Sequence, residues 1–292
     1  MNHYLTTSEL ADLLRIKERK VYALASSGKI PCSRATGKLL FPRDEIELWI
    51  NQNLSGEMVM LPAARANQIV GSHDPLLEWA IRESRCGLAT LFDSSLDGLN
   101  KFANLDGIAT GLHMFDQIQQ SWNINAVKHH SDQSSAVLVE WAIRERGLIL
   151  GQQCRKPIKG LKDIGDNRFV PRQPEAGSQL LLESLLRGEA IEPRTLNWAH
   201  PARSELDAVL EVQSGNADMA FGLAAMADQF KLEFVSIVDE RFDLLVDRTA
   251  WFEPAWQSLL SFCKTSVFKE RAAQMTGYQT DNQFQVRFNG SR

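Results

Sequence analysis

The chain has 292 residues, of which 44% are hydrophobic and 23% are charged, and its formal net charge is -4 at pH 7. This composition is typical of a globular chain that folds in water, and the length allows one large core or two to three smaller ones. The negative net charge excludes a protein that coats nucleic acid along its whole surface.

The basic residues are nevertheless concentrated near the N-terminus. From Arg15 to Arg43 the chain has eight Lys or Arg residues and one acid, Glu18, a local excess of seven positive charges. Such a segment is typical of a small module that contacts phosphate groups.

Targeting segments and cysteine spacing give further limits. The N-terminus lacks the basic and apolar regions of a signal peptide, and no later segment has the roughly 18 uninterrupted apolar residues of a membrane span. We therefore expect a cytoplasmic protein with no membrane partner. The chain has four cysteines, Cys32, Cys86, Cys154 and Cys263. Because they have no C-x-x-C spacing, they predict neither a disulfide framework nor a zinc module, and no cofactor is expected.

The first predicted elements are two short helices joined by a tight turn. Thr6 or Thr7 can cap a first helix, whose leucines recur at i, i+3 and i+4. The second helix passes through Val21 and Tyr22 and ends at Gly28.

A wing and a third helix are predicted next. The stretch "KIPCSRATGKLLF" indicates two short strands around a Thr36-Gly37 turn, and Pro42 is expected at the first position of the third helix. The N-terminal pattern is therefore a helix-turn-helix with a wing.

These residues resemble the excisionase-like, MerR-related winged helix-turn-helix family. The motifs L-T-x-x-E-x-A-x-x-L, V-Y-x-L-x-x-x-G-x-I-P and G-x-x-x-F-x-x-x-E-I-x-x-W are present as Leu5 to Leu14, Val21 to Pro31 and Gly37 to Trp49. The resemblance implies a DNA-binding domain over residues 1–53.

On this resemblance the second helix enters the major groove and the wing reaches phosphate or the minor groove. One such module neutralises few phosphates, so binding to double-stranded DNA is expected to require two half-sites and a homodimer. The expected DNA-binding residues are Lys17, Arg19, Lys20, Tyr22, Arg34 and Lys38.

Residues 54–68 contain Gly, Pro and small residues without a settled period, which predicts a linker. Strand and helix patterns then alternate, beginning with "QIVGS", "PLLEWAIRES", "GLATLFD", "SLDGLNKFAN" and "IATGLHMFD". This alternation predicts an α/β domain with a mostly parallel sheet.

The order of segments resembles the type 2 periplasmic-binding-protein fold, in the PBP-like form found behind helix-turn-helix modules and beside molybdopterin-biosynthesis proteins. The likeness rests on "GSHDPLLE", "GLHMFD", "RERGLIL" with "KPIKGLKDI", "RQPEAGSQLLL", "VQSGNADMAFGL" and "ERFDLLV". The predicted fold class is thus α/β, with an N-terminal winged helix-turn-helix followed by a two-lobed PBP-like ligand-binding domain over residues 69–292.

The resemblance implies two lobes joined by two chain crossings, near 147–151 and 243–248. Lobe one then comprises 69–146 plus 249–292, and lobe two comprises 152–242. The ligand is expected in the cleft between them, at strand ends and helix N-termini.

The expected ligand-binding residues come from three segments that face this cleft. The Gly-Ser-His-Asp turn and the "RQPEAGSQ" turn each precede a helix, so their hydroxyl and backbone N–H donors favour an anion, and Arg172 can add a charge-assisted pair. The set is Gly71, Ser72, His73, Asp74, His113, Asp116, Arg172, Gln173, Gly177 and Ser178.

Simpler interpretations of these residues remain open. Ser72 can be a helix N-cap, Arg172 a surface partner of Glu175, and Asp74 and Asp116 helix caps or backbone acceptors. Together with His73 and His113, the two aspartates also have the residue types of a transition-metal site.

The function predicted from the sequence is a ligand-responsive transcriptional regulator that senses a small anion. The anion is a molybdate- or tungstate-type oxyanion, from the resemblance, or a small carboxylate, which Arg172 suits equally. The alternatives are a divalent-metal sensor, an enzyme using His73 or His113 as acid or base, and an architectural DNA-binding factor. The architectural factor would account only for the first 50 residues, and catalysis is not expected because the chain has no G-x-S-x-G elbow, P-loop or Cys/His nucleophile pair.

Overall fold

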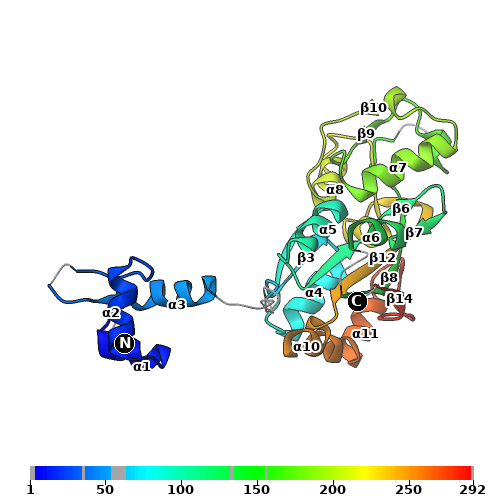
Figure 1. Cartoon of the computed structure of the whole chain (residues 1–292). Coiled ribbons are helices and arrows are strands. Elements are labelled where there is room, and N and C mark those ends of the chain that lie inside the picture. Colours follow the sequence, from blue (N-terminus) through cyan, green and yellow to red (C-terminus); the bar gives the residue numbers. More distant parts are fainter. Residues whose placement is uncertain (1–3, 35–36, 54–63, 132–134, 155–156, 291–292) are drawn as a thin grey trace. The chain divides into compact units, whose positions relative to one another are not determined.

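The computed structural model describes residues 4–34, 37–53, 64–131, 135–154 and 157–290. The chain divides into two compact units, Met1–Ala63 and Ala64–Arg292 (Figure 1). The predicted linker, 54–68, lies mostly outside the described residues, and Gln68 already belongs to the first strand of the larger unit.

Within its described residues, 4–34 and 37–53, the smaller unit contains three helices and a two-stranded antiparallel sheet. Thr6 caps the first helix in a capping box, in which it accepts from the Glu9 backbone N–H at 3.3 Å and donates its own N–H to Glu9 Oε2 at 2.7 Å. The elements are β1 (Tyr4–Leu5), α1 (Thr7–Leu14), α2 (Glu18–Ser26), β2 (Phe41–Pro42) and α3 (Arg43–Gln52). The predicted helix-turn-helix and its Thr6 cap are confirmed.

The wing differs from the expected pair of strands. Ser33 and Leu40 form one isolated antiparallel bridge, while Phe41 pairs with Leu5 of β1. The predicted Thr36-Gly37 turn falls partly outside the described residues, although Gly37 has a φ of 76° that suits a glycine turn. Pro42 ends β2, and α3 begins one residue later than predicted.

The larger unit alternates strands and helices up to its first long strand. The elements are β3 (Gln68–Ser72), α4 (Pro75–Ser84), β4 (Ala89–Asp93), α5 (Ser95–Ala103), β5 (Ala109–Leu112), β6 (Phe115–Asp116), β7 (Ser121–Trp122), α6 (Ile124–Ser131) and β8 (Ala136–Leu150). Strands β3, β4 and β5 are parallel, so their carboxyl ends lie at one edge of the sheet.

The second half of this unit repeats the alternation and then returns. The elements are β9 (Arg168–Val170), α7 (Gly177–Gly188), β10 (Asn197–Trp198), α8 (Glu205–Gln213), β11 (Met219–Leu223), α9 (Ala224–Gln229), β12 (Glu233–Asp247), α10 (Pro254–Cys263), α11 (Ser266–Ala273), β13 (Tyr278–Gln279) and β14 (Val286–Asn289), with 3-10 turns at Leu161–Asp163, Pro193–Thr195 and Ala250–Phe252.

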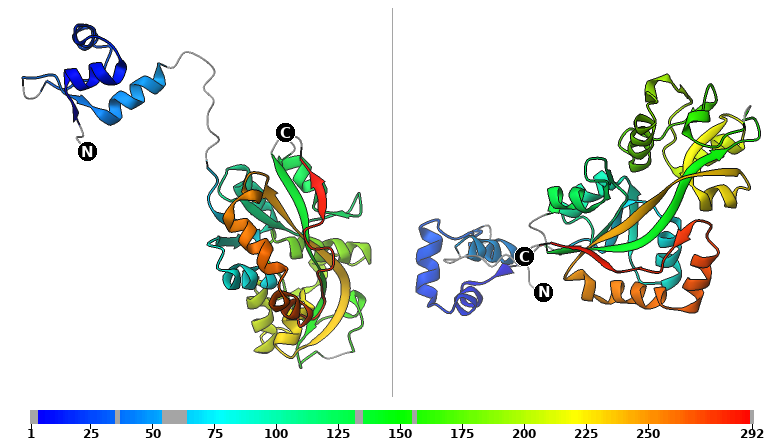
Figure 2. Two further views of the ribbon diagram at one scale, coloured as in Figure 1. Left: turned by 90° about the horizontal axis from the view of Figure 1, so that it is seen from below. Right: turned by 90° about the vertical axis from the view of Figure 1, so that its right-hand side faces the viewer.

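Most strands of the larger unit form one continuous sheet in the order β10-β9-β11-β8-β12-β5-β3-β4, with β13 and β14 also paired to β8, while β6 and β7 pair only with each other. Strands β8 and β12 pair with each other along their length and run through both lobes (Figure 2). At one end β8 pairs with β11, and at the other end β12 pairs with β5. These two long strands are therefore the connection between the lobes.

The positions of the two crossings differ slightly from those expected. Strand β8 already pairs with β11 at Arg146, and β12 has reached β5 at Asp243. The second crossing therefore precedes the expected interval 243–248. Helices α10 and α11 and strands β13 and β14 return to the lobe that contains β3, as Figure 1 shows.

Each lobe has its own apolar core. In lobe one, Trp141 and Phe242 of the long strands pack with Trp256 of α10, and all three are fully buried. In lobe two, Leu148 and Phe169 pack with the helix residue Leu182. Full burial of one apolar side chain contributes roughly 1.5–3 kcal/mol to the free energy of folding. Because the two clusters are distinct, each lobe is stabilised by its own core.

All four cysteines are free thiols. None of the helices within the described residues combines the length and the apolar character needed to cross a bilayer.

Candidate functional site

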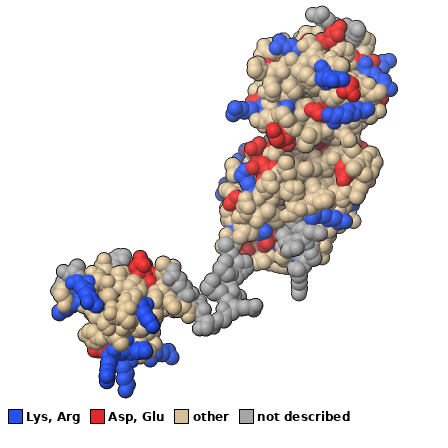
Figure 3. Space-filling view, turned by 45° about the horizontal axis from the view of Figure 1, so that its top comes forward, with Lys and Arg blue, Asp and Glu red and all other residues tan. Residues whose placement is uncertain are grey.

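The six residues predicted to bind DNA lie on the exposed surface of the smaller unit. Three form the N-terminal part of α2, where Lys17 is the N-cap residue, followed by Arg19 and Lys20. Lys and Arg side chains protrude from this unit in the view of Figure 3. The start of α2 is therefore a positively charged, accessible surface.

The other three surround a surface depression between α2 and the wing. Tyr22, Arg34 and Lys38 all line it, and the Tyr22 side chain is 52% exposed. Arg34 donates from Nη2 to the Ala25 carbonyl at 3.4 Å, which holds the wing near α2. The structure thus groups the predicted residues into a helix-start set and a wing set on one unit.

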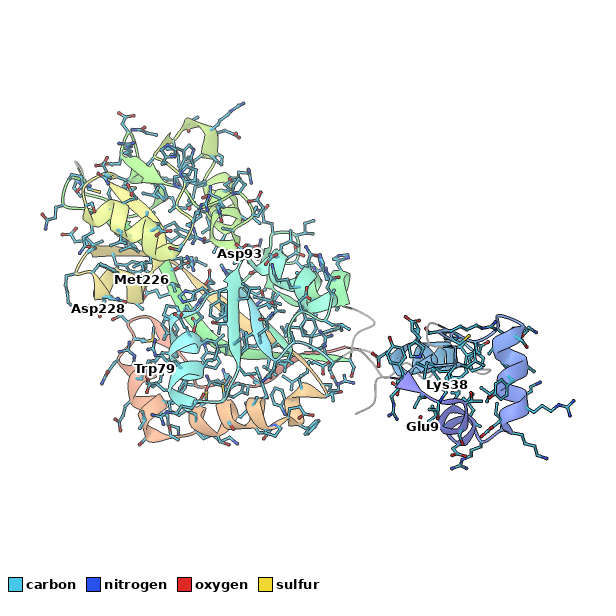
Figure 4. All side chains as sticks on the ribbon, turned by 90° about the vertical axis from the view of Figure 1, so that its left-hand side faces the viewer. Glu9, Lys38, Trp79, Asp93, Met226 and Asp228 are labelled. Carbon is cyan, nitrogen blue, oxygen red and sulfur yellow. The ribbon has the colours of Figure 1, made fainter. Side chains whose placement is uncertain are left out.

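A cavity of about 440 Å³ lies between the two lobes of the larger unit. The carboxyl ends of β3, β4 and β5 reach it from lobe one, through Ser72, Asp93 and His113. From lobe two it is reached by Arg172 after β9 and Met226 after β11, and Figure 4 shows Asp93 and Met226 at the junction of the lobes. Ligands of open α/β sheets bind at such strand ends.

The N-terminal ends of four helices line the same cavity. Helices α4 and α5 contribute from lobe one, and α7 and α8 from lobe two. Each helix N-terminus carries partial positive charge and unpaired backbone N–H groups. Their convergence favours a negatively charged group inside the cavity.

Helix α7 is the one of these four whose N-terminus has no side-chain cap. The cap residues Asp74, Ser94 and Ser204 each accept a backbone N–H, whereas Ala176 has no side chain that can do so. The donors at Gly177 and Ser178 therefore face the cavity without a side-chain acceptor from their own cap.

Arg172 lies beside this open helix end. Its Nε donates to the Ala202 carbonyl at 3.1 Å, and Nη2 donates to the Arg203 carbonyl at 2.8 Å. Burial lowers the pKa of the guanidinium below its ordinary value, yet an arginine stays protonated at any physiological pH. The carbonyls hold the positive charge in one place at the cavity wall.

Six of the ten predicted ligand residues line the cavity together: Ser72, His73, His113, Arg172, Gly177 and Ser178. Gly177 packs against His113 so closely that an added Cβ would lie 3.0 Å from its Cε1 atom. This contact joins the two lobes across the cavity. Ser72 Oγ is 2.7 Å from Ser95 Oγ and does not cap α4, so its interpretation as a helix cap is wrong.

The other four predicted residues are placed differently. Gly71 packs against β5, where a Cβ would lie 2.3 Å from Thr110 Oγ1, and Gln173 contributes a turn carbonyl to the Ala176 N–H. Asp116 accepts the N–H groups of Ile118 and Gln119 in the β6–β7 turn. Its interpretation as a backbone acceptor is confirmed.

Asp74 is turned away from the cavity into the core. It caps α4 through the Leu77 N–H at 2.7 Å, and it accepts from Trp141 Nε1 at 2.8 Å and from the Tyr278 hydroxyl at 2.7 Å. Arg144 Nη1 lies 2.9 Å from its second oxygen. The cap interpretation of Asp74 is confirmed, because its carboxylate accepts the Leu77 N–H at the start of α4.

A buried ionic cluster underlies the cavity. Glu240 of β12 is fully buried and contacts Arg144, Arg146 and His113, whose Nδ1 lies 3.0 Å from Oε2. Arg146 Nε forms an ion pair with Glu240 at 2.6 Å, although its N–H is not aligned for a hydrogen bond. Arg146 Nη2 forms a second ion pair, with Glu205, also at 2.6 Å. Because His113 and Glu205 also line the cavity, the cluster connects both walls to the long strands.

The cluster changes the acidity of its members in a consistent direction. Burial alone would raise the pKa of Glu240, but the guanidinium groups of Arg144 and Arg146 outweigh it and hold that pKa well below its ordinary value. Burial likewise opposes the charged form of Glu205, and Arg146 reverses the effect, so its pKa is also lowered. Both carboxylates are ionised at neutral pH.

A metal ion is not indicated by this arrangement. His73 pairs with Glu78 at 2.9 Å and His113 pairs with Glu240, so the two imidazoles have separate partners. Within the described ranges, no three His, Cys, Asp or Glu side chains are grouped so as to hold a metal ion.

Comparison with known proteins identifies two parts of the chain. A helix-turn-helix domain family matches residues 4–54, and a PBP superfamily domain matches residues 78–264. The chain belongs to the PBP superfamily. The predicted combination of an excisionase-like helix-turn-helix with a PBP-like domain is confirmed.

Relatives of this PBP-superfamily chain include the uncharacterized protein YvgK of Bacillus subtilis (strain 168), 22% identical over 296 residues and 94% of each chain. The sulfate-binding protein SubI from Mycobacterium tuberculosis H37Rv has a TM-score of 0.51 at 14% identity, covering 75% of this chain and 88% of its own. PhnD1 from Prochlorococcus marinus (MIT 9301), solved with methylphosphonate, has a TM-score of 0.49 at 12% identity, covering 74% and 92%. At these identities the solved structures show the fold alone.

Sequence reasoning missed several charged residues of the PBP-superfamily domain. Arg144 and Arg146 stand two apart within "RERGLIL", a spacing that places both side chains on one face of a buried strand and signals buried partners. Asp93 is the last residue of the strand "ATLFD" and lies at its carboxyl end, where ligand contacts are expected. Glu205 gave a weaker signal, since it only opens a helix.

Proposed function

We propose that this PBP-superfamily protein is a DNA-binding regulator that senses a small anion. The observation that carries the proposal is the interlobe cavity, where an uncapped helix N-terminus and the fixed charge of Arg172 meet three further helix ends. The helix-turn-helix match and the basic surface of α2 support DNA as the second partner. The combination of the two domains supports a non-enzymatic regulator.

In this proposal residues 1–53 bind operator DNA, 54–68 link the domains and 69–292 bind the ligand. The ligand is a molybdate- or tungstate-type oxyanion or a small carboxylate, held by Ser72, His73, His113, Arg172, Gly177 and Ser178. Backbone donors at strand ends and helix ends suit both ligands.

Regulation in this proposal arises from closure of the lobes on the anion. A ligand that binds the closed form more tightly shifts the population toward it. In a cytoplasmic homodimer such closure changes the spacing of two helix-turn-helix units, and therefore the affinity for paired half-sites. A footprint of the full-length protein on its own upstream DNA, with and without added oxyanions and carboxylates, tests both activities together. A footprint that no added anion changes contradicts the proposed sensing.

The first prediction concerns the DNA surface. Arg19→Ala on α2 should relax sequence preference, because an arginine in the major groove reads base edges. Lys38→Ala on the wing should weaken binding to all sequences and reduce the salt slope by about one unit. Mobility-shift titrations at several salt concentrations measure both effects.

Lys231→Ala is the matched control for charge removal, because this exposed lysine belongs to lobe two and pairs with Asp228. If Arg19→Ala and Lys38→Ala both bind DNA as Lys231→Ala does, then α2 and the wing are not the DNA-binding surface.

The second prediction concerns the two serines. Ser72 and Ser178 lie on opposite lobes of the cavity and are each 3% exposed. Each Ser→Ala change should weaken binding of the sensed anion by roughly 1.5–3 kcal/mol, since a hydrogen bond to a charged group is lost. Calorimetric titration of the full-length protein with sodium molybdate, sodium sulfate and small carboxylates measures the change. Ser84→Ala, whose hydroxyl bonds to the Ile81 carbonyl outside the cavity, should leave affinity unaltered, and equal losses in all three variants would refute the assignment.

A further inference from the structure

The charged side chains that line the interlobe cavity are not all positive. Three carboxylates line it, and two of them have close partners: Glu78 is 2.9 Å from His73, and Glu205 is 2.6 Å from Arg146. The third, Asp93, forms no hydrogen bond or ion pair through its side chain with any described residue. A free carboxylate therefore lies in a cavity whose other features favour an anion.

Asp93 and the anion-binding features occupy opposite walls. Asp93 ends β4 on lobe one, whereas Arg172 and the open end of α7 belong to lobe two. The charges of Asp93 and Arg172 are close enough to interact, so both act on the same enclosed space. A multiply charged oxyanion in that space would be repelled by Asp93, since like charges disfavour each other at short range.

The cavity also has apolar surface that an inorganic anion cannot use. Phe92, Leu206 and Met226 line it, and the Phe92 ring meets the edge of His73 at a centroid distance of 5.4 Å. Its volume of about 440 Å³ lies within the range of cavities that hold small organic ligands. Burial of an apolar group against these side chains would contribute to affinity.

We propose that the ligand is a small organic zwitterion, an amino-carboxylate with an apolar portion. Its carboxylate lies at Arg172 and the N-terminus of α7, its ammonium group lies at Asp93, and its apolar portion packs on Phe92 and Met226. This assignment rests on the proposed anion-sensing function and selects the carboxylate class over the tetrahedral oxyanions. The opposite charges of the two walls then match the opposite charges of one ligand.

Calorimetric titration of the full-length protein tests this assignment. The probes are the proteinogenic amino acids, the 2-hydroxy acids with the same side chains, sodium molybdate and sodium sulfate. At least one amino acid should bind, and its hydroxy acid should bind about ten- to a hundred-fold more weakly, because the charge-assisted bond to Asp93 is missing. Asp93→Asn should remove that difference, while Asp106→Asn, an exposed aspartate of the same lobe outside the cavity, should keep it.

The outcomes separate this assignment from the proposed function. Hydroxy acids that bind as tightly as amino acids, or an oxyanion that binds the wild type more tightly than any amino acid does, overturn the zwitterion and leave anion sensing in place. The assignment is also overturned if the wild type and Asp93→Asn prefer an amino acid over its hydroxy acid by the same factor. If no probe binds, the zwitterion and the anion-sensing function both fail, and DNA binding is judged by its own mobility shifts.

Discussion

Glu240→Ala should lower the free energy of unfolding of the larger unit by about 3–5 kcal/mol, because two buried arginines then lose the carboxylate that they share. The carboxylate is fully buried between Arg144 and Arg146, and both guanidinium groups are at most 1% exposed. No other described carboxylate contacts both arginines. Denaturant unfolding followed by tryptophan fluorescence measures the loss as a lower midpoint.

The neighbouring Asp239→Ala is the control for this change. Asp239 is exposed on the same strand, so its removal should alter the free energy of unfolding by no more than about 0.5 kcal/mol.

The pH dependence of the free energy of unfolding gives a second check. Since the folded-state pKa of Glu240 is lowered, its contribution is complete above the unfolded-state value of about 4.3 and is lost as the pH falls. The difference between wild type and variant should therefore shrink in acid, and a difference that is absent at neutral pH contradicts the structural role of the cluster.

The cluster also marks the limit of what the sequence could predict. The helix-turn-helix was predictable because its signals are local: the Thr6 cap bonds to Glu9 three residues away, and Gly28 supplies a positive φ at the end of α2. The order of strands and helices in the larger unit was predictable for the same reason. Alternating apolar patterns and turn residues specify elements, but they do not specify which charged groups meet.

Asp74 shows why part of the site was misplaced. Its position in a turn before a helix suits a cavity residue as well as a cap, and both interpretations use the same local sequence. The decision comes from Trp141, Arg144 and Tyr278, which lie 67 to 204 residues further along the chain. Long-range partners of this kind leave no local periodic signal, so only the fold distinguishes an inward carboxylate from one that meets a ligand.

Asp93 and Arg172 illustrate the opposite case. Asp93 is the last residue of β4 and Arg172 lies two residues after β9, and strand ends of parallel sheets gather at one edge, so both had a signal in the sequence. Arg172 was predicted from its charge, which fits an anion. Asp93 was missed because a carboxylate does not fit an anion unless the ligand also carries a positive charge.

Arg172→Ala should weaken binding of a carboxylate ligand by about 2–5 kcal/mol, the cost of truncating one partner of a buried, hydrogen-bonded charge pair. Two of its nitrogens are held by the carbonyls of Ala202 and Arg203, and Nη1 forms no hydrogen bond with the described residues, so a donor with fixed orientation remains for the ligand. Arg172→Lys should restore only part of the affinity, because the three donors of an ammonium group share one nitrogen and do not reproduce the planar guanidinium fork.

Arg168→Ala is the matched control, an exposed arginine of β9 in the same lobe that does not line the cavity. Calorimetric titration with the best-binding carboxylate should show a large loss for Arg172→Ala, a smaller loss for Arg172→Lys and none for Arg168→Ala. DNA binding by the unliganded protein should stay the same in all three, because Arg172 is proposed to act only through the ligand.

A contrary outcome would be that Arg172→Ala binds every anion with an affinity within about threefold of the wild type, while Ser72→Ala and Ser178→Ala bind it weakly. In that case hydroxyl and backbone donors hold the ligand alone. A tetrahedral oxyanion would then replace the carboxylate as the sensed ligand, since backbone N–H groups at helix N-termini can bind such an anion without a guanidinium group.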